Sequence, residues 1–285
     1  MKQDVLSGRI VRWVNVTSLP NIKEKVPLFH GSQRLQDGPF AETTANKVLE
    51  KVLEHQNRPL SICFTKSKLN NYLTGGTCSA MSMDFLKKYL NIKKELSYKD
   101  RPWSLLNRVR KLEKDFKTSS RAFRAVQAAL NTIAIVNPYT DHAKDKAQAL
   151  LNYIDCSIAP AFDEIDLNIS PKRCVEEAIS FLPLGIYFAR ALRPAENKKL
   201  ELYGHSTVFI KEKNFCVFYD PMQGAMAFPH KKSGTIMRKE FNQMNDNWAV
   251  TKLRFYRISP QKNKHCIPEF AQAFFSCGAK KRFSA

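Results

Sequence analysis

The first half of the chain carries apolar residues at helical spacing. Between residues 41 and 56 they recur at intervals of three and four, which places them on one helix face: Val48, Leu49, Val52 and Leu53. The same spacing predicts further helices over 79–90, 103–116, 121–134, 142–154 and 171–181.

The pattern changes after about residue 184, where short apolar runs are separated by turn residues. These runs predict strands over 185–192, 206–210, 215–219, 224–228 and 248–258, with one further helix over 232–244. The polar segment 211–214 joins two of these strands and predicts a tight hairpin. Helices followed by an antiparallel sheet indicate the α+β fold class.

Other segments show neither periodicity clearly. Residues 1–38 hold many turn formers and two prolines and are expected to be irregular, and residues 155–170 look like a loop. The apolar run 60–64 is too short to separate helix from strand. With 285 residues, of which 44% are hydrophobic, the chain is long enough for one sizeable core.

Charge is the most unusual bulk property of the chain. It has 46 Lys and Arg against 26 Asp and Glu, a net charge of +20. A basic surface attracts acidic partners, namely nucleic acid, an anionic membrane face or an acidic protein. No window matches a nucleic-acid-binding motif, so we expect a solvated basic surface and no specific nucleic-acid partner.

The cysteines and histidines do not predict a metal site. Seven cysteines without a CxxC pair fit neither a disulfide framework nor structural zinc, and neither His230 nor the pair His265 and Cys266 has ligand spacing. We therefore expect no metal and no cofactor. Residues 1–14 lack the apolar core of a signal peptide, and no apolar run is long enough to span a membrane.

Cys78 is the cysteine placed for chemistry. It follows the glycine pair Gly75 and Gly76, and the helical pattern begins directly after it. A helix N-terminus stabilises a thiolate through its dipole and unpaired N–H groups. The backbone N–H of Cys78 is also positioned to donate to an oxyanion, and the glycines allow a substrate backbone to approach.

The second half of a catalytic set lies in the predicted sheet. His205 begins one strand, and Asp220 ends the next. The hairpin between them makes the two strands antiparallel neighbours, so His205 is expected to face Asp220. A carboxylate in this place would hold the imidazole tautomer, as in catalytic triads.

The same residues resemble a known family. The stretches Gly-Gly-Thr-Cys78-Ser-Ala-Met-Ser, Gly204-His205-x-x-x-Phe-Ile and Phe218-Tyr-Asp220-Pro-Met-Gln-Gly-Ala-Met-Ala-Phe228 resemble the YopT-type papain-like cysteine protease effectors of bacterial pathogens. The resemblance covers about residues 70–258. It implies a papain-like fold, with a helical half followed by a sheet half, and the roles of nucleophile for Cys78, base for His205 and orienting group for Asp220.

The resemblance also implies an organisation and a setting. We expect an irregular N-terminal segment 1–40 for secretion or chaperone binding, a papain-like hydrolase domain 41–260 and a basic tail 261–285. The substrate would be a host protein, acidic or membrane-associated, met in the host cytosol after secretion from the bacterial cytoplasm. Papain-like enzymes place an oxyanion-binding amide shortly before the cysteine, where the nearby candidates are Asn70 and Asn71.

Other functions fit the same residues. A Cys-His-Asp set also serves acyltransferases, transglutaminase-like enzymes and deubiquitinases. A different class is a non-enzymatic basic module that binds nucleic acid or anionic lipid, in which the triad pattern would be a coincidence. Binding with a steep salt dependence that survives loss of Cys78 would favour that class.

Overall fold

A computed structural model of the chain describes residues 22–32, 77–96, 102–118, 156–166, 172–192, 204–248 and 252–260, with the single positions 123, 127, 147, 148, 151, 154 and 250. The predicted helix 41–56 and the apolar run 60–64 lie outside these residues. Of the predicted helices 121–134 and 142–154, only isolated positions are described, and the predicted tail 261–285 is outside them.

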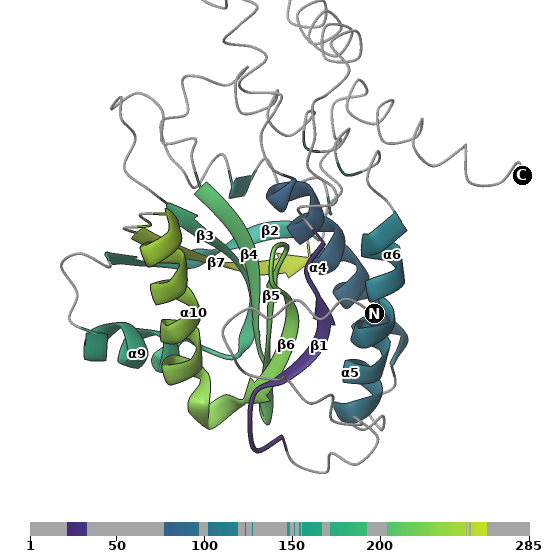
Figure 1. The fold of residues 1–285 in the computed structure, drawn as a ribbon, viewed down its shortest axis with the longest axis horizontal. Helices are drawn as coiled ribbons and strands as arrows, with labels where there is room; N and C mark the ends of the chain where they lie inside the picture. Colours follow the sequence, from purple (N-terminus) through teal and green to yellow (C-terminus); the bar gives the residue numbers. More distant parts are fainter. Residues whose placement is uncertain are drawn as a thin grey trace, which may run out of the picture.

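Antiparallel strands form one seven-stranded sheet with the order β1-β6-β5-β4-β3-β7-β2 (Figure 1). Every neighbouring pair is antiparallel. The strands are β1 (Val26–His30), β2 (Cys156–Asp166), β3 (Gly185–Leu192), β4 (Gly204–Lys211), β5 (Phe215–Asp220), β6 (Gly224–Pro229) and β7 (Lys252–Pro260). The predicted hairpin is confirmed, because β4 ends at Lys211, β5 starts at Phe215, and the N–H of Glu212 donates to the carbonyl of Phe215 (2.9 Å).

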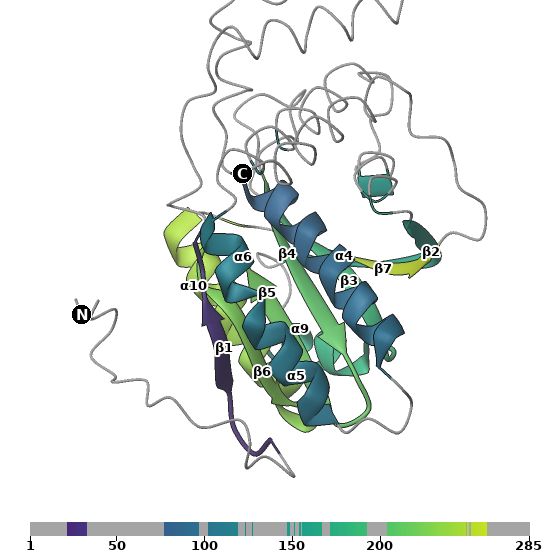
Figure 2. The same cartoon turned by 90° about the vertical axis from the view of Figure 1, so that its right-hand side faces the viewer.

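Helices cover both faces of this sheet (Figure 2). One layer holds α4 (Cys78–Glu95), α5 (Pro102–Lys111) and α6 (Glu113–Thr118), and the opposite layer holds α9 (Lys172–Phe181) and α10 (Ser233–Trp248), with the short 3-10 helix η2 (His230–Lys232) before α10. The α+β class is therefore confirmed, although the helices do not all precede the sheet or share one side of it.

Because helices cover both faces of the sheet, its central strands are buried on both faces. In β5 every residue is buried, and neighbouring side chains enter different cores. Phe218 packs with Phe241 of α10 (ring centroids 5.8 Å apart), whereas Tyr219 stacks on Phe85 of α4 (4.2 Å). A strand between two helical layers needs an apolar run instead of an alternating pattern, which is what the sequence of β5 provides.

Two strands lie where the sequence predicts none. β1 falls in the segment expected to be irregular, and β2 falls in the segment 155–170 expected to be a loop, so both predictions are wrong for these residues. Both are edge strands, and each has a register shift close to a proline, between Pro27 and Phe29 in β1 and between Ile158 and Phe162 around Pro160 in β2. An edge strand tolerates proline and bulges because its outer side needs no ladder partner.

The helix boundaries also differ in places from those predicted. The single helix expected over 103–116 is interrupted at Leu112 and appears as α5 and α6, and α10 continues to Trp248. Within the described part of the chain, no helix combines the length and the apolar character that crossing a membrane requires.

Candidate active site

Cys78 is the first residue of α4. The preceding Thr77 makes no side-chain capping hydrogen bond, and instead the Oε1 of Gln127 accepts a hydrogen bond from the N–H of Ala80 (3.0 Å). A buried side chain that is distant in sequence thus satisfies one of the N–H groups of the first turn. The helix terminus at Cys78 is thereby held in place with its positive dipole end at the thiol.

His205 controls the protonation of this thiol. Burial by itself would raise the pKa of Cys78, but the hydrogen bond and positive charge of His205 lower it below its ordinary value, helped by a backbone hydrogen bond from Ser206 and the charge of Arg190. For His205, burial by itself would lower the pKa, because it disfavours the charged imidazolium. The charge and hydrogen bond of Asp220, followed by those of Cys78, raise that pKa to about 10. Both shifts favour the pair of thiolate and imidazolium over the pair of neutral thiol and neutral imidazole.

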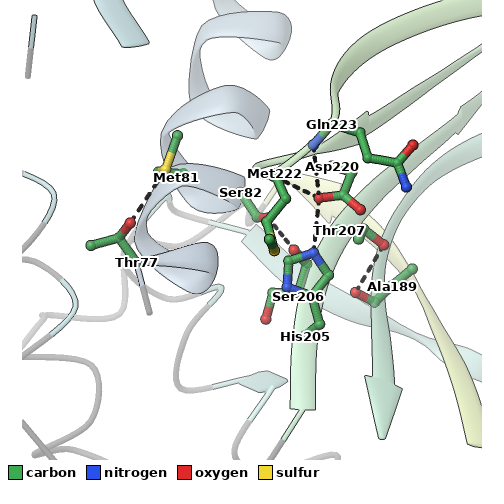
Figure 3. Close-up of polar contacts among 10 residues, drawn as sticks. All are labelled: Thr77, Met81, Ser82, Ala189, His205, Ser206, Thr207, Asp220, Met222 and Gln223. Atoms are coloured by element: carbon green, nitrogen blue, oxygen red, sulfur yellow. Dashed lines mark hydrogen bonds and ion pairs between the residues drawn. The ribbon is translucent and has the colours of Figure 1, made fainter. Parts of the chain in front are cut away.

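Asp220 holds the imidazole at its Nε2 atom (Figure 3). His205 Nε2 lies 2.9 Å from Asp220 Oδ1, and this oxygen also accepts hydrogen bonds from the N–H groups of Met222 (2.7 Å) and Gln223 (3.4 Å). Because Nε2 faces the carboxylate, Nδ1 is the ring nitrogen left for Cys78. Asp220 is fully buried, and its Oδ2 makes no hydrogen bond to another described residue, so Oδ1 alone positions the carboxylate here.

Serine hydroxyls tie α4 to β4 at the level of Cys78. Ser79 Oγ lies 2.9 Å from Ser206 Oγ, and Ser82 Oγ donates to the carbonyl of Ser206 (2.8 Å). Ser206 directly follows His205 in the strand, so these bonds fix the helix that carries the nucleophile against the strand that carries the base. All three serines are buried, which makes these hydrogen bonds expensive to lose.

The end of β1 supports the turn after Asp220. The N–H of Ser32 donates to the carbonyl of Pro221 (3.1 Å), and Ser32 Oγ donates to the carbonyl of Phe116 in α6 (3.1 Å). Gly224 closes the turn with φ = 105°, a left-handed conformation that favours glycine. A segment expected to be irregular is therefore part of the framework of the site.

The structure brings Cys78, His205 and Asp220 together. The oxyanion candidates Asn70 and Asn71 lie outside the described residues, as do His265 and Cys266. His230 directly follows β6, at the end of that strand away from Asp220, and its Nδ1 lies 3.1 Å from the carbonyl of Lys213. Among the described residues no group of three His, Cys, Asp or Glu side chains is arranged to hold a metal ion, and Cys78, Cys156 and Cys216 are free thiols.

Sequence reasoning missed Gln127, Ser206 and the end of β1 as parts of the site. One sequence signal pointed toward the contact with Ser206. Ser79 and Ser82, three residues apart, place two polar side chains on one buried face of α4, and buried polar groups need partners. No sequence signal pointed to Gln127, because its hydrogen bond to Ala80 joins two residues that are far apart in the chain and meet only through tertiary packing.

The three comparisons with known proteins find similar structures only. The avirulence protein AvrPphB of Pseudomonas shares 14% identity, with 64% of this chain and 91% of that chain covered and a TM-score of 0.47. PatoxP, a cysteine protease-like domain of the Photorhabdus asymbiotica toxin PaTox, shares 12% identity over 76% of this chain and 88% of that chain, with a TM-score of 0.22. No family model and no curated protein matches the chain. The chemistry of the site therefore rests on Cys78, His205 and Asp220 themselves.

Proposed function

We propose that this chain is a cysteine protease that hydrolyses an amide bond in a protein substrate. Cys78 is the nucleophile, His205 the general acid and base, and Asp220 the group that orients His205. One observation carries the proposal: a thiol of lowered pKa starts a helix and is hydrogen-bonded to a histidine whose Nε2 lies 2.9 Å from a buried carboxylate. This is the arrangement that nucleophilic catalysis by a thiolate requires.

In the first half-reaction the Cys78 sulfur attacks the carbonyl carbon of the scissile bond, and the carbonyl electron pair moves to the oxygen. The backbone N–H of Cys78 at the start of α4 donates to this oxyanion. When the intermediate collapses, the C–N bond breaks and His205 gives its Nδ1 proton to the leaving amine. An acyl-thioester on Cys78 remains.

In the second half-reaction water attacks the thioester carbon, and His205 accepts a proton from the water at Nδ1. Collapse of this intermediate breaks the C–S bond and releases the carboxylic acid product. The thiolate of Cys78 and the imidazolium of His205 are restored. Asp220 stays ionised and stabilises the charged imidazole in each cycle.

The setting of this chemistry follows from the family resemblance. We propose that the substrate is a host protein, that the chain acts as a bacterial effector in the host cytosol, and that a secretion chaperone handles it beforehand. The motifs around Cys78, His205 and Asp220, which resemble YopT-type effectors, support this setting. The net charge of +20 suits an acidic or membrane-associated substrate.

The first test is the rate at which iodoacetamide alkylates each cysteine as a function of pH, read by mass spectrometry in the native chain and in His205→Ala. We expect Cys78 to react far faster than the other cysteines near neutral pH and to lose this advantage without His205. Equal reactivity of Cys78 and its neighbours in both proteins would rule out the thiolate–imidazolium pair and with it the protease.

A second test separates hydrolysis from other acyl transfer. A host-cell lysate is treated with the native chain or with Cys78→Ala, and newly formed protein N-termini are labelled and sequenced. We expect new N-termini in the first sample only, with His205→Ala lowering their rate of formation by about 10²–10⁴-fold. Reactive Cys78 without new N-termini would instead indicate isopeptide cleavage or transfer to an acceptor other than water.

A further inference from the structure

The turn between α9 and β3 presents large apolar side chains to solvent. Phe181 is 82% exposed and Leu184 is 47% exposed. Leaving such side chains in water forgoes the favourable free energy of their burial. Two of them within four residues therefore suggest contact with a partner that removes them from water.

This turn is held firmly, so the exposure does not come from a fraying helix end. The buried Lys211 of β4 donates through Nζ to the carbonyl groups of Ile179 (3.4 Å), Ser180 and Leu182 (2.7 Å). Arg257 of β7 donates through Nη2 to the carbonyl of Leu184 (3.0 Å). The sheet thus fixes the backbone on both sides of the apolar pair.

Exposed cations surround the apolar pair. Gly234 packs so closely against α9 that a Cβ there would lie 2.4 Å from Ser180 Oγ, so the start of α10, directly after η2, lies against the last turn of α9. His230 of η2 contacts the carbonyl of Lys213 at the β4–β5 hairpin (3.1 Å). The exposed residues gathered here, named the apolar–basic surface below, are Phe181, Leu184, Lys213, Lys231, Lys232 and Arg257.

Acidic side chains near this surface do not cancel its charge. Glu212 of the hairpin pairs with Lys93 and accepts a hydrogen bond from Tyr89, and Glu176 of α9 pairs with Arg238 (2.8 Å). Glu177, one helical turn before Phe181, is exposed. The four exposed cations outnumber it, so the surface is positive around an apolar centre.

We propose that the apolar–basic surface docks this protein peripherally on an anionic lipid membrane. Apolar side chains that enter the headgroup region and lysines that meet anionic lipids are the two signals that stable peripheral binding needs. A nucleic acid would satisfy the cations, but its phosphate backbone gives Phe181 and Leu184 no apolar environment. A fluid bilayer accommodates both the cations and the two apolar side chains without a preformed pocket.

Docking by this surface would point the catalytic residues away from the membrane. His205 lies near the start of β4 and Lys211 at its end, and a strand of this length spans roughly 20 Å. Cys78 would therefore stand above the bilayer and reach a protein segment that projects from it. This inference does not depend on the proposed protease activity, because no residue of the surface belongs to the catalytic set.

The test is co-sedimentation of the full chain carrying Cys78→Ala with vesicles of phosphatidylcholine alone and of equimolar phosphatidylcholine and phosphatidylserine. We expect binding to the anionic vesicles only, weakened by salt. Phe181→Ser with Leu184→Ser should reduce vesicle affinity at least about tenfold. Lys231→Ala with Lys232→Ala should reduce it by roughly 30-fold.

A matched control removes the same charge at the other end of the molecule. Lys114→Ala with Lys117→Ala changes α6, which lies near the catalytic turn, and should leave vesicle binding unchanged. The proposal is overturned if the two double-lysine variants lose vesicle affinity equally, or if the variant at Phe181 and Leu184 binds as tightly as the parent chain. It is also overturned if the chain does not bind anionic vesicles at all. If the chain does not bind vesicles but binds an acidic protein or a nucleic acid through Lys231 and Lys232, then that molecule is the partner and the membrane is not.

Discussion

The Cα of Gly31 lies against the carbonyl oxygen of Met222, so that a Cβ on residue 31 would stand only 2.1 Å from this oxygen. Met222 belongs to the turn whose N–H groups hold Asp220 Oδ1. The chain after β1 is thus packed directly against the support of the proposed orienting carboxylate. Since the contact is with backbone, a larger residue at position 31 cannot be accommodated by a side-chain rotation.

Replacement of Gly31 by alanine should therefore disturb the catalytic set. We expect the added methyl group to displace the 221–223 turn and to lower the alkylation rate of Cys78 near neutral pH. A displacement of about 1 Å at a catalytic group costs on the order of 10²-fold in rate. The measurement is the pH-dependent alkylation rate together with the free energy of unfolding, which should fall by about 1–3 kcal/mol.

Gly185→Ala is the matched control for this prediction. At Gly185 a Cβ would meet the Nε of Arg257 at 2.9 Å, a contact with a flexible side chain that can move away. We expect native alkylation of Cys78 in this variant. A Gly31→Ala protein with native Cys78 reactivity would show that the end of β1 does not position Asp220.

The charge of Asp220 should set the upper pH limit of activity. It is the main cause that raises the pKa of His205 to about 10, so the imidazolium persists until the pH rises through this value. Asp220→Asn keeps an oxygen that can accept from Nε2 but removes the charge. We expect the basic limb of the hydrolysis rate against pH to move to lower pH and the rate at neutral pH to fall. A basic limb that stays in place in Asp220→Asn would contradict this assignment.

The same pKa predicts a pH dependence of stability. Because the pKa of His205 is raised above about 6.5, its unfolded value, the folded state binds more protons between these pH values. The stabilisation is complete below about 6.5 and is lost as the pH rises toward the folded pKa. The lowered pKa of Cys78 acts in the opposite direction, so Cys78→Ala removes that effect and leaves the contribution that His205 gains from Asp220.

This contribution can be measured by urea unfolding of Cys78→Ala and of Cys78→Ala with His205→Gln. As the pH rises from 6 to 9, the difference in their unfolding free energies should decrease by up to about 1.4 kcal/mol for each pH unit above about 6.5. A difference that is constant or increases with pH would mean that His205 is not held as the imidazolium.

Lys211 should be a stabilising residue without a role in catalysis. Its Nζ donates to the carbonyl groups of Ile179 and Ser180 at the end of α9 and of Leu182 just after it, where a cation also offsets the negative end of the helix dipole. Lys211→Met keeps the length of the side chain but leaves these carbonyls unsatisfied. We expect a loss of about 1–3 kcal/mol in unfolding free energy and native alkylation of Cys78. Loss of Cys78 reactivity in a folded Lys211→Met protein would contradict this.

The predictable part of the structure was the part built from local pattern. Apolar runs and a polar four-residue connection were sufficient to place β4 and β5 as a hairpin, and their antiparallel pairing carries His205 to the side of Asp220. The loop-to-helix junction at Cys78 was likewise visible, because the helical period starts directly after it. These features depend on neighbours within a few residues or on one turn.

The sequence by itself therefore determined the α+β class, the central strands and the three residues that we propose for catalysis. Only the tertiary structure decided that β1 and β2 complete the sheet at its edges, because edge strands containing Pro27 and Pro160 lack the apolar alternation that marks a strand. It also decided that Gln127, Ser206 and Gly31 support the site. Their contacts join segments far apart in the chain, and such contacts depend on packing, which local periodicity does not encode.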